Sequence, residues 1–324
     1  MPLRTRLVVR AISRERGAIS SLTADEIPRM RAWSAPARPP YSWITGPVRR
    51  DVSIGSTAFR ARDGHSVGVR TYRPRTGGAG PFPVLVWLHG GGWVLGNTRS
   101  YDPICTAIAH AAGVLVLSID YRLAPEFRAP RAALDCVDAV RWVARTAPAL
   151  GARPDGIGVA GDSAGANLSA VVTQVVRAEG GADLTHQSLV YPAVDATMSQ
   201  PSVAEHAGGA ILTRADMDTF LGHYLGEGPE SLERVDPLVS PLYAADLAEL
   251  PPALVQTADL DPLRDDGAAY AEALRDAGVE VELTNYLRVP HGFHSFPGAT
   301  PVGRVARDEL TRWIARHAHR PRVG

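Results

Sequence analysis

Residues 157–165 read Ile-Gly-Val-Ala-Gly-Asp-Ser-Ala-Gly, and this stretch decides the fold. Its first four residues form a short apolar run typical of a buried strand, and a helical pattern over 166–176 follows it. Gly161–Gly165 fits the G-x-S-x-G pattern, in which a serine lies on a sharp turn between a strand and a helix. Because glycines have no Cβ atoms to collide at such a turn, the hydroxyl of Ser163 can be exposed beside a helix N-terminus. The motif therefore predicts a nucleophilic serine rather than one that only caps a helix.

Short apolar runs alternate with helical segments on both sides of this motif. The expected strands are Val48–Arg60, Ser66–Tyr72, Val84–Leu88, Val114–Ser118, Ile157–Ala160, Gln187–Val190, Ala253–Gln256 and Val279–Leu287. The expected helices lie near 100–112, 130–147, 163–178, 264–277 and 302–317. This alternation predicts an α/β fold with a mainly parallel central sheet and helices on both faces. The first two strands alternate in polarity and are expected to be antiparallel at a sheet edge.

Two segments do not follow this alternation. Residues 1–45 read as helix and loop, and Thr23 with Glu26 three positions later predicts a helix start. Residues from about 198 to 232 read as helices with no sheet strand, which indicates an insertion. We therefore expect an N-terminal segment, 1–45, ahead of a catalytic domain, 46–324, that contains the insertion.

A second glycine motif, His89-Gly-Gly-Gly-Trp93, follows the strand expected at Val84–Leu88. Consecutive glycines let backbone N–H groups approach a ligand closely. Acyl transfer places negative charge on a former carbonyl oxygen and needs fixed donors at that point. We assign this oxyanion hole to the N–H groups of Gly91, Gly92 and Ala164. The alternatives are a flexible turn and a phosphate-binding loop, but no Gly-Lys-Ser/Thr follows.

A serine nucleophile needs a base, and ten histidines compete for that role. His291 follows the last expected strand, where the histidine of a Ser…Asp…His order should fall. His294 is its nearest rival.

The third member of the triad should be a carboxylate that orients the base. Asp261 ends the preceding strand, directly before Pro262, and Asp259 is the runner-up two residues earlier. Asp265 and Asp266 fall in the first turn of the next helix, where acidic residues suit the helix dipole.

Composition excludes several classes of protein. The chain of 324 residues has a formal net charge of +0, which gives no electrostatic reason to bind nucleic acid or an anionic membrane. No apolar run approaches the roughly 20 residues of a membrane span or the core of a signal peptide, so we expect a cytoplasmic protein without stable membrane insertion. Every basic residue is Arg, which excludes lysine chemistry. Cys105 and Cys136 are too few for a zinc site and are expected to be packing residues.

Several of these motifs occur together in one known family, in the same order over about residues 80–300. The matching segments are HGGGWVLGN (89–97), SIDYRLAPE (118–126), GDSAGANL (161–168), SPLYA (240–244), LPPALVQTADLDPLRDD (250–266) and HGFHSF (291–296). In these segments the chain resembles the bacterial hormone-sensitive-lipase family of esterases. The resemblance implies the α/β-hydrolase fold, a triad of Ser163, Asp261 and His291, and a helical cap formed by the two segments that lack strands. It also implies structural roles for Tyr121 and Arg122.

The residues and the resemblance together predict a carboxylesterase that works through an acyl-enzyme on a small-molecule ester, with no metal or organic cofactor. We expect Trp93, Ile211 and Leu212 to line a bounded pocket that takes short to medium acyl chains, about C2 to C8. The resemblance makes a homodimer plausible. Two alternatives stay open, an amidase or peptidase with the same triad and a non-catalytic ligand-binding protein on this fold.

Overall fold

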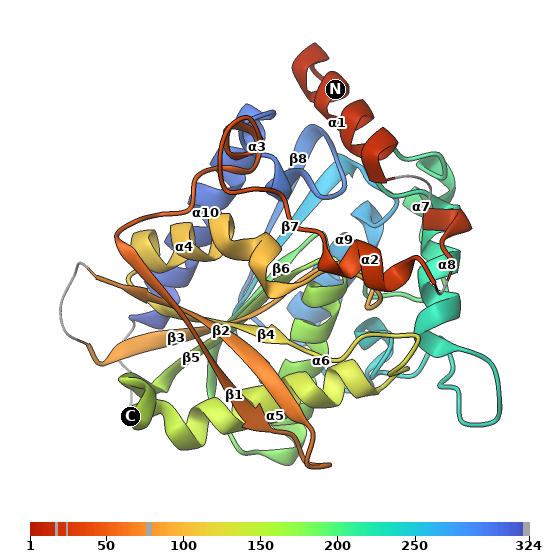
Figure 1. Cartoon of the computed structure of the whole chain (residues 1–324). Coiled ribbons are helices and arrows are strands. Elements are labelled where there is room, and N and C mark those ends of the chain that lie inside the picture. The colour runs from red at the N-terminus through yellow and green to blue at the C-terminus, as the bar shows by residue number, and fades with distance from the viewer. Residues whose placement is uncertain (17–18, 24, 76–79, 320–324) are drawn as a thin grey trace.

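A twisted sheet organises the computed structural model of the chain (Figure 1). The structure describes residues 1–16, 19–23, 25–75 and 80–319, without the side chains of residues 15 and 16. Within that part of the chain, eight strands follow the order β1-β2-β4-β3-β5-β6-β7-β8. Their bounds are β1 Val52–Arg60, β2 Ser66–Pro74, β3 Phe82–Leu88, β4 Leu115–Asp120, β5 Ala152–Asp162, β6 Leu184–Val190, β7 Ala253–Leu260 and β8 Val281–Pro290. Every strand expected from the sequence is confirmed.

Strand direction also agrees with the sequence. β1 pairs with β2, and β2 with β4, in antiparallel register, while every pair from β4 to β8 is parallel. The run Val84–Leu88 of β3 is fully buried because this strand lies in the middle of the sheet with helices on both faces. The carboxyl ends of parallel strands meet at one edge of the sheet, and this edge carries the site described below.

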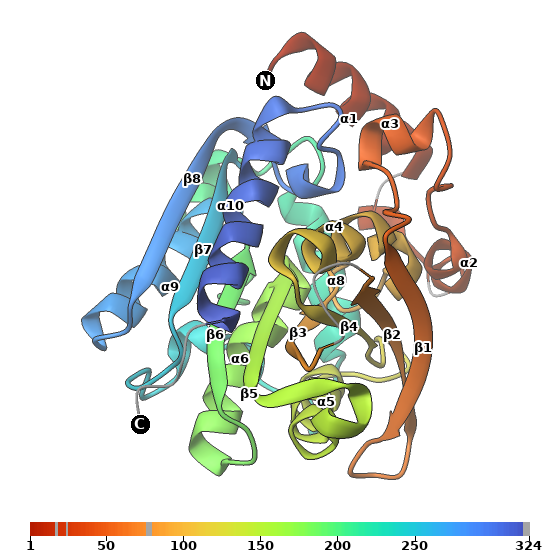
Figure 2. The same ribbon diagram turned by 90° about the vertical axis from the view of Figure 1, so that its left-hand side faces the viewer.

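Helices cover both faces of the sheet (Figures 1 and 2). Their bounds are α4 Asp102–Ala112, α5 Arg131–Thr146, α6 Ala164–Glu179, α9 Arg264–Asp276 and α10 Pro301–Ala318. Short 3₁₀ turns connect some of these elements: η2 Thr98–Tyr101, η3 Ala147–Leu150, η4 Pro241–Tyr243 and η5 Phe293–Ser295. Buried side chains of α4 and α10 form one core cluster, and those of α5, α6 and α9 pack in two others. Cys105 and Cys136 are buried and unpaired within different clusters, as packing residues would be.

The remaining helices belong to the two segments without strands. They are α1 Leu3–Arg16, η1 Ile19–Ser21, α2 Ile27–Ala32 and α3 Tyr41–Thr45 in the first, and α7 Pro201–Glu205 and α8 Arg214–Leu225 in the second. The segments touch each other: the N–H of Ser20 donates to Asp216 Oδ1 (2.9 Å) and the hydroxyl of Ser13 donates to the carbonyl of Ala210 (2.7 Å). α1 lies at the top of the molecule in both ribbon views. The division into cap and catalytic domain stays a prediction.

The helix start expected at Thr23 is wrong by a few residues. The Glu26 carboxylate does accept from the N–H of Thr23 (2.9 Å), which is half of a capping box. The Thr23 hydroxyl, however, donates to that same carboxylate (2.8 Å), and Glu26 itself is the residue that precedes the helix. Helix α2 begins at Ile27 because Pro28 suits a first turn, where its missing N–H costs nothing.

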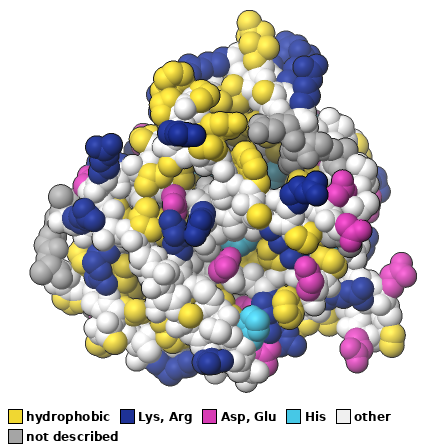
Figure 3. Space-filling view, viewed as in Figure 1, with side chains coloured by type: hydrophobic (Ala, Val, Ile, Leu, Met, Phe, Trp, Pro, Cys, Tyr) yellow, Lys and Arg dark blue, Asp and Glu magenta, His cyan; other side chains and the backbone are white. Residues whose placement is uncertain are grey.

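No helix among the described residues combines the length and the apolar character needed to cross a membrane. Hydrophobic side chains do reach the surface in the N-terminal segment, where Figure 3 shows them gathered over the region of α1 and α3. The large exposed ones in this segment are Leu3, Leu7, Trp33 and Trp43. The N-terminal segment therefore carries an exposed apolar surface.

Candidate active site

Ser163 lies on the turn between β5 and α6, in the left-handed region with φ 56°. A Cβ on Gly161 would lie 2.4 Å from the backbone of Gly165, and a Cβ on Gly165 would lie 2.0 Å from the carbonyl oxygen of Leu88. The turn therefore fits only with glycine at both positions. The N–H of Ser163 donates to the carbonyl of Val190 (2.8 Å), which holds the turn against β6. Strain of this kind persists where surrounding structure enforces it, as at functional sites.

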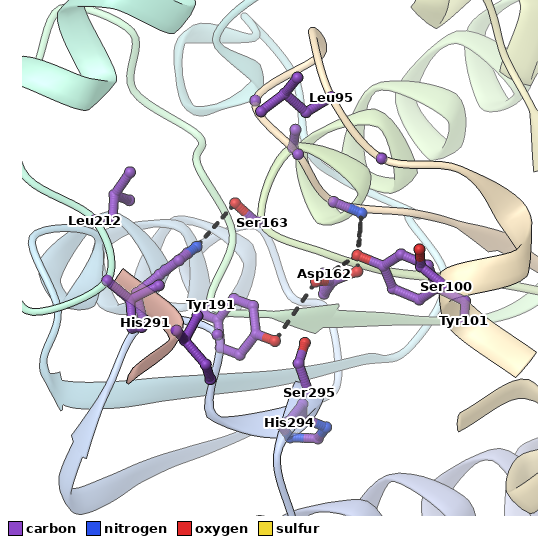
Figure 4. Close-up of a pocket in the computed structure, with 18 of the residues that line it drawn as sticks. Leu95, Ser100, Tyr101, Asp162, Ser163, Tyr191, Leu212, His291, His294 and Ser295 are labelled. Carbon is purple, nitrogen blue, oxygen red and sulfur yellow. Dashed lines mark hydrogen bonds between the residues drawn. The ribbon is translucent and has the colours of Figure 1, made fainter. Parts of the chain in front are cut away.

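The structure brings Ser163, His291 and Asp261 into one hydrogen-bonded chain. His291 Nε2 lies 3.0 Å from Ser163 Oγ, and His291 Nδ1 lies 2.7 Å from Asp261 Oδ2. A carboxylate only accepts, so Nδ1 carries the proton and Nε2 is left to accept from the serine. Figure 4 shows the imidazole pointing at the hydroxyl of Ser163. The arrangement can activate an alcohol as a nucleophile.

The two candidate aspartates at the end of β7 point to different partners. Asp261 is fully buried, and its second oxygen accepts from the N–H of Leu263 (2.9 Å). Asp259 instead accepts from the N–H of Val289 in β8 (3.1 Å), so it ties the two strands together. Asp265 and Asp266 lie in the first turn of α9, as expected.

His294, the rival to His291, makes no hydrogen bond to the serine in the part of the chain that the structure describes. It is buried in η5, and within the described part of the chain neither of its ring nitrogens has a hydrogen-bond partner. Burial holds the pKa of His294 well below its usual value, so this imidazole is neutral. It lines the same cavity as Ser163.

The glycine loop lies next to the nucleophile. Gly91 and Gly92 have φ values of 127° and 61°, and with Ala164 they line the cavity around Ser163. A Cβ on Gly91 would lie 2.2 Å from the carbonyl oxygen of Leu95, and one on Gly92 would lie 2.3 Å from the ring of Phe220 in α8. Glycine is thus required both by the turn and by the close approach of the second segment.

His89 and Tyr121 stabilise the glycine loop through contacts between their own side chains and main chain. Their rings stack with centroids 4.4 Å apart, and the Tyr121 hydroxyl donates to the carbonyl of His89 (2.6 Å). Arg122 lies outside the site and forms a buried pair with Asp135 (Nε to Oδ2, 2.9 Å). These contacts are those of structural residues.

Sequence reasoning missed Asp162, the variable residue of the serine motif. Its Oδ1 accepts from the N–H of Gly90 (3.0 Å), and its Oδ2 accepts from the hydroxyl of Tyr101 (3.1 Å), so it fastens the glycine loop to the end of β5. Burial raises the pKa of Asp162 to about 6, against the opposing influence of Tyr101, His291 and the Gly90 N–H. A carboxylate at the end of an apolar strand was the available signal.

Tyr191 was also missed. It follows β6 with φ 37°, and its ring lies against that of His291 with centroids 4.6 Å apart. Its hydroxyl reaches toward Asp162 (3.5 Å, Figure 4). Tyr191 thus fixes one side of the imidazole, although nothing in its local sequence pattern indicates that role.

A cavity of about 500 Å³ opens over the serine. The three residues expected in the pocket, Trp93, Ile211 and Leu212, all line it. Trp93 is held by stacking on Tyr224, with centroids 4.5 Å apart. Both segments without strands contribute apolar side chains to the wall, among them Ile12, Ile19, Met217 and Phe220.

The chain resembles known proteins over most of its length. Residues 85–295 match a family described by the α/β hydrolase fold. Over 237 residues the chain is 46% identical to carboxylesterase NlhH of Mycobacterium tuberculosis, covering 73% of this chain and 74% of that protein. It is 36% identical over 252 residues to ethyl acetate hydrolase of Pseudomonas putida, covering 77% and 78% respectively. A solved hyperthermophilic esterase from the archaeon Pyrobaculum calidifontis superposes with a TM-score of 0.84 at 33% identity, over 98% of each chain.

Proposed function

Because the chain belongs to the bacterial hormone-sensitive-lipase family of α/β-hydrolase-fold esterases and hydrolyses carboxylic esters, we propose that Ser163, His291 and Asp261 carry out the reaction. The observation that carries this proposal is the unbroken chain of contacts from Asp261 Oδ2 to His291 Nδ1 (2.7 Å) and from His291 Nε2 to Ser163 Oγ (3.0 Å). The cavity opens directly over the serine, so a substrate has access to it.

The reaction proceeds through an acyl-enzyme. The Ser163 hydroxyl attacks the ester carbonyl carbon while His291 Nε2 takes its proton. The imidazolium then gives that proton to the leaving alkoxide, and the alcohol departs. Water repeats the attack on the acyl-serine with the same base, which releases the carboxylic acid and restores Ser163. Asp261 keeps the imidazole in the required tautomer and stabilises its charged form.

The N–H groups of Gly91, Gly92 and Ala164 donate to the negatively charged oxygen of the tetrahedral intermediate and stabilise it. Ala164 is the first residue of α6, where the helix dipole adds to the attraction. Preorganised donors of this kind stabilise the transition state more than the substrate. Asp162 holds the loop through Gly90, so we assign it a positioning role.

The preferred acyl chains are short to medium, about C2 to C8. A cavity of about 500 Å³ with apolar walls is bounded, so the gain from each added methylene stops once the chain fills it. A relative named ethyl acetate hydrolase is consistent with small esters. Location in the cytoplasm and a homodimeric state stay predictions from the sequence.

Replacement of the nucleophile tests the proposal. Ser163→Ala should lower turnover of a 4-nitrophenyl butyrate substrate by on the order of 10⁴ or more, because only binding and oxyanion stabilisation remain. Ser169→Ala is the matched control, since Ser169 lies on α6, the helix that follows Ser163, and its hydroxyl donates to the carbonyl of Gly165. Near-normal activity of Ser163→Ala would overturn the mechanism. Faster turnover of the matching anilide than of the ester would favour an amidase.

A further inference from the structure

Arg307 of α10 lines the cavity at a place where no role in ester hydrolysis requires a charge. It lies with His294 and Ser295 of η5, which line the cavity as well. Figure 4 shows His294 and Ser295 side by side, separated from Leu212 by His291 and Tyr191. The cavity therefore has an apolar wall on the side of the covering segments and a polar group of side chains elsewhere.

The charge of Arg307 is not balanced by an ion pair. Its Nε donates to the carbonyl of His294 (2.9 Å), Nη2 donates to the same oxygen, and Nη1 donates to the carbonyl of Thr45 (3.3 Å). These three bonds leave two of the five guanidinium N–H groups without a partner among the described residues. None of the ion pairs formed within the same part of the chain includes Arg307, whose partners there are carbonyl oxygens.

Arg307 is nevertheless charged at neutral pH. Burial lowers the pKa of its guanidinium only to about 10. Of the groups that favour its charge, Tyr191 and Cys105 are protonated, because burial holds their pKa values well above the usual range. Asp162 remains, and it acts from a distance, since its oxygens are bonded to Gly90 and Tyr101. Buried charges are normally paired, so a positive charge beside a cavity without a contacting anion is unusual.

His294 supplies a second, independent sign of a polar ligand. Its side chain is only 2% exposed, and neither ring nitrogen has a partner among the described residues. The neutral imidazole offers one donor and one acceptor, which are costly to leave unsatisfied. Arg307 keeps part of its surface accessible although protein surrounds it, and because it lines the cavity, a bound molecule can reach it.

We propose that Arg307, His294 and Ser295 form a subsite for a carboxylate carried by the substrate, so that the enzyme favours esters with an anionic group over neutral esters of equal length. The guanidinium supplies the charge and its unused N–H groups, and the neutral imidazole supplies a further donor, while the Ser295 hydroxyl beside them is hydrogen-bonded to Tyr191. This inference rests on the proposed function, because it names the class of ester that the same site accepts.

The competing explanation is that Arg307 only fastens η5 and α3 through main-chain carbonyls. A purely structural role predicts that loss of the guanidinium lowers turnover of all esters equally. A carboxylate subsite predicts that it changes the ratio between anionic and neutral esters. The ratio within a matched substrate pair is therefore the informative quantity, because a general loss of active enzyme cancels from it.

Two matched pairs place the carboxylate on either side of the ester. Mono-4-nitrophenyl glutarate against 4-nitrophenyl pentanoate tests the acyl side, and 3-carboxypropyl butyrate against butyl butyrate tests the alcohol side. In at least one pair, kcat/KM for the anionic ester should be about 10-fold or more above that for the neutral ester. This is the size expected of a charge-assisted hydrogen bond. Arg307→Gln should remove this preference. Arg304→Gln is the matched control, an exposed arginine on the same helix, and should keep it.

Ratios below one in both pairs with the unaltered enzyme would overturn the subsite, and so would an unchanged ratio in Arg307→Gln. If Arg307→Gln does not fold, the ratios of the unaltered enzyme decide the question alone. Failure of the subsite differs from failure of the proposed function. In the first case neutral esters are still hydrolysed in a Ser163-dependent way, and in the second they are not.

Discussion

The carboxyl edge of the sheet and the two segments that cover it are built in different ways. At the edge, Ser163, Asp261 and His291 each follow a strand, and neighbouring main-chain groups hold the turns in place. The covering segments contribute no strand to the sheet, and they meet through hydrogen bonds such as that from Ser20 to Asp216 and through packed side chains of η1 and α8. We therefore propose that the edge fixes the chemical step and that the cover, which lines the cavity, sets the acyl length that fits. Variants at the edge should slow all esters alike, and variants in the cover should change their ranking.

The largest effect is expected at His291, the base at the edge. His291→Ala should lower turnover by on the order of 10⁴ or more for every ester, because the serine then has no group to take its proton. His294→Ala, three residues away, should keep substantial activity on neutral esters. Turnover of both purified variants on acetate and octanoate esters measures this. The reverse ranking would show that the edge is assigned wrongly.

A second pair of variants tests which aspartate at the edge orients His291. Asp261→Asn should lower turnover by on the order of 10³ to 10⁴, because the amide favours the wrong imidazole tautomer. Asp259→Asn removes only an acceptor for the N–H of Val289 and should retain most activity. Steady-state kinetics of the two proteins, with melting temperatures as a check on folding, separate the cases. Equal activity of Asp261→Asn and the unaltered enzyme would contradict the triad.

Sequence predicted the edge far better than the cover. All eight strands, their mainly parallel direction, Ser163 and His291 follow from local patterns, because strand ends and tight glycine turns leave strong signals. The choice of Asp261 over Asp259 rested on the strand end and on the family resemblance, since the two lie two residues apart. The start of α2 was misplaced at Thr23, since a capping pattern describes local bonds that can form without continuing into a helix. How the covering segments meet depends on tertiary contacts that no periodicity records.

Residues that act through long-range contacts were missed for the same reason. Asp162 occupies the variable position of its motif, and only the fold brings it to Gly90, 72 residues away in sequence. Tyr191 reaches His291 because β6 ends beside the site. Arg307 reads as one more arginine on an amphipathic helix until the cavity beside it is seen. The sequence contains these residues but not the distances between them.

A variant in the covering segments should change the preferred acyl length rather than the turnover of all esters. Leu212→Ala removes bulk from the cavity wall, so the acyl length with the highest kcat/KM should shift upward from the range of about C2 to C8. Each further methylene that the enlarged cavity can bury gains about 0.8 kcal/mol, or roughly fourfold in kcat/KM. A 4-nitrophenyl ester series from acetate to palmitate measures the profile for both proteins.

The control for that profile is Arg214→Ala, an exposed residue two positions further along the chain. It should leave the optimum where it was. A uniform loss across the series in Leu212→Ala would show that the cover acts on the chemical step and would erase the distinction between the two regions. A steady rise through long chains in the unaltered enzyme, or activation at an oil–water interface, would show that exposed residues such as Trp33 and Trp43 bind lipid and that the pocket is not bounded.

The last expected effect concerns stability rather than turnover, and it is a pH dependence at Asp162, which lines the cavity and holds the glycine loop through Gly90. Its pKa is raised to about 6 by burial, whereas an unfolded aspartate titrates near about 4. Between about pH 4 and pH 6, therefore, the carboxyl group of Asp162 is protonated in the folded state and ionised in the unfolded state. The stability that this proton provides is fully present below about pH 4 and is lost as pH rises through about 6.

Asp162→Asn cannot titrate, so the comparison isolates this one group. Relative to the unaltered enzyme, the free energy of unfolding of Asp162→Asn should rise by on the order of 1–3 kcal/mol between about pH 4 and pH 7, and then stay level. The constant offset from altered contacts to Gly90 and Tyr101 does not affect this slope. Urea unfolding of both proteins at several pH values gives the difference directly. A difference that is independent of pH, or that falls as pH rises, would mean that the carboxyl is not held protonated at the edge, and that the glycine loop is fastened by an ionised group throughout.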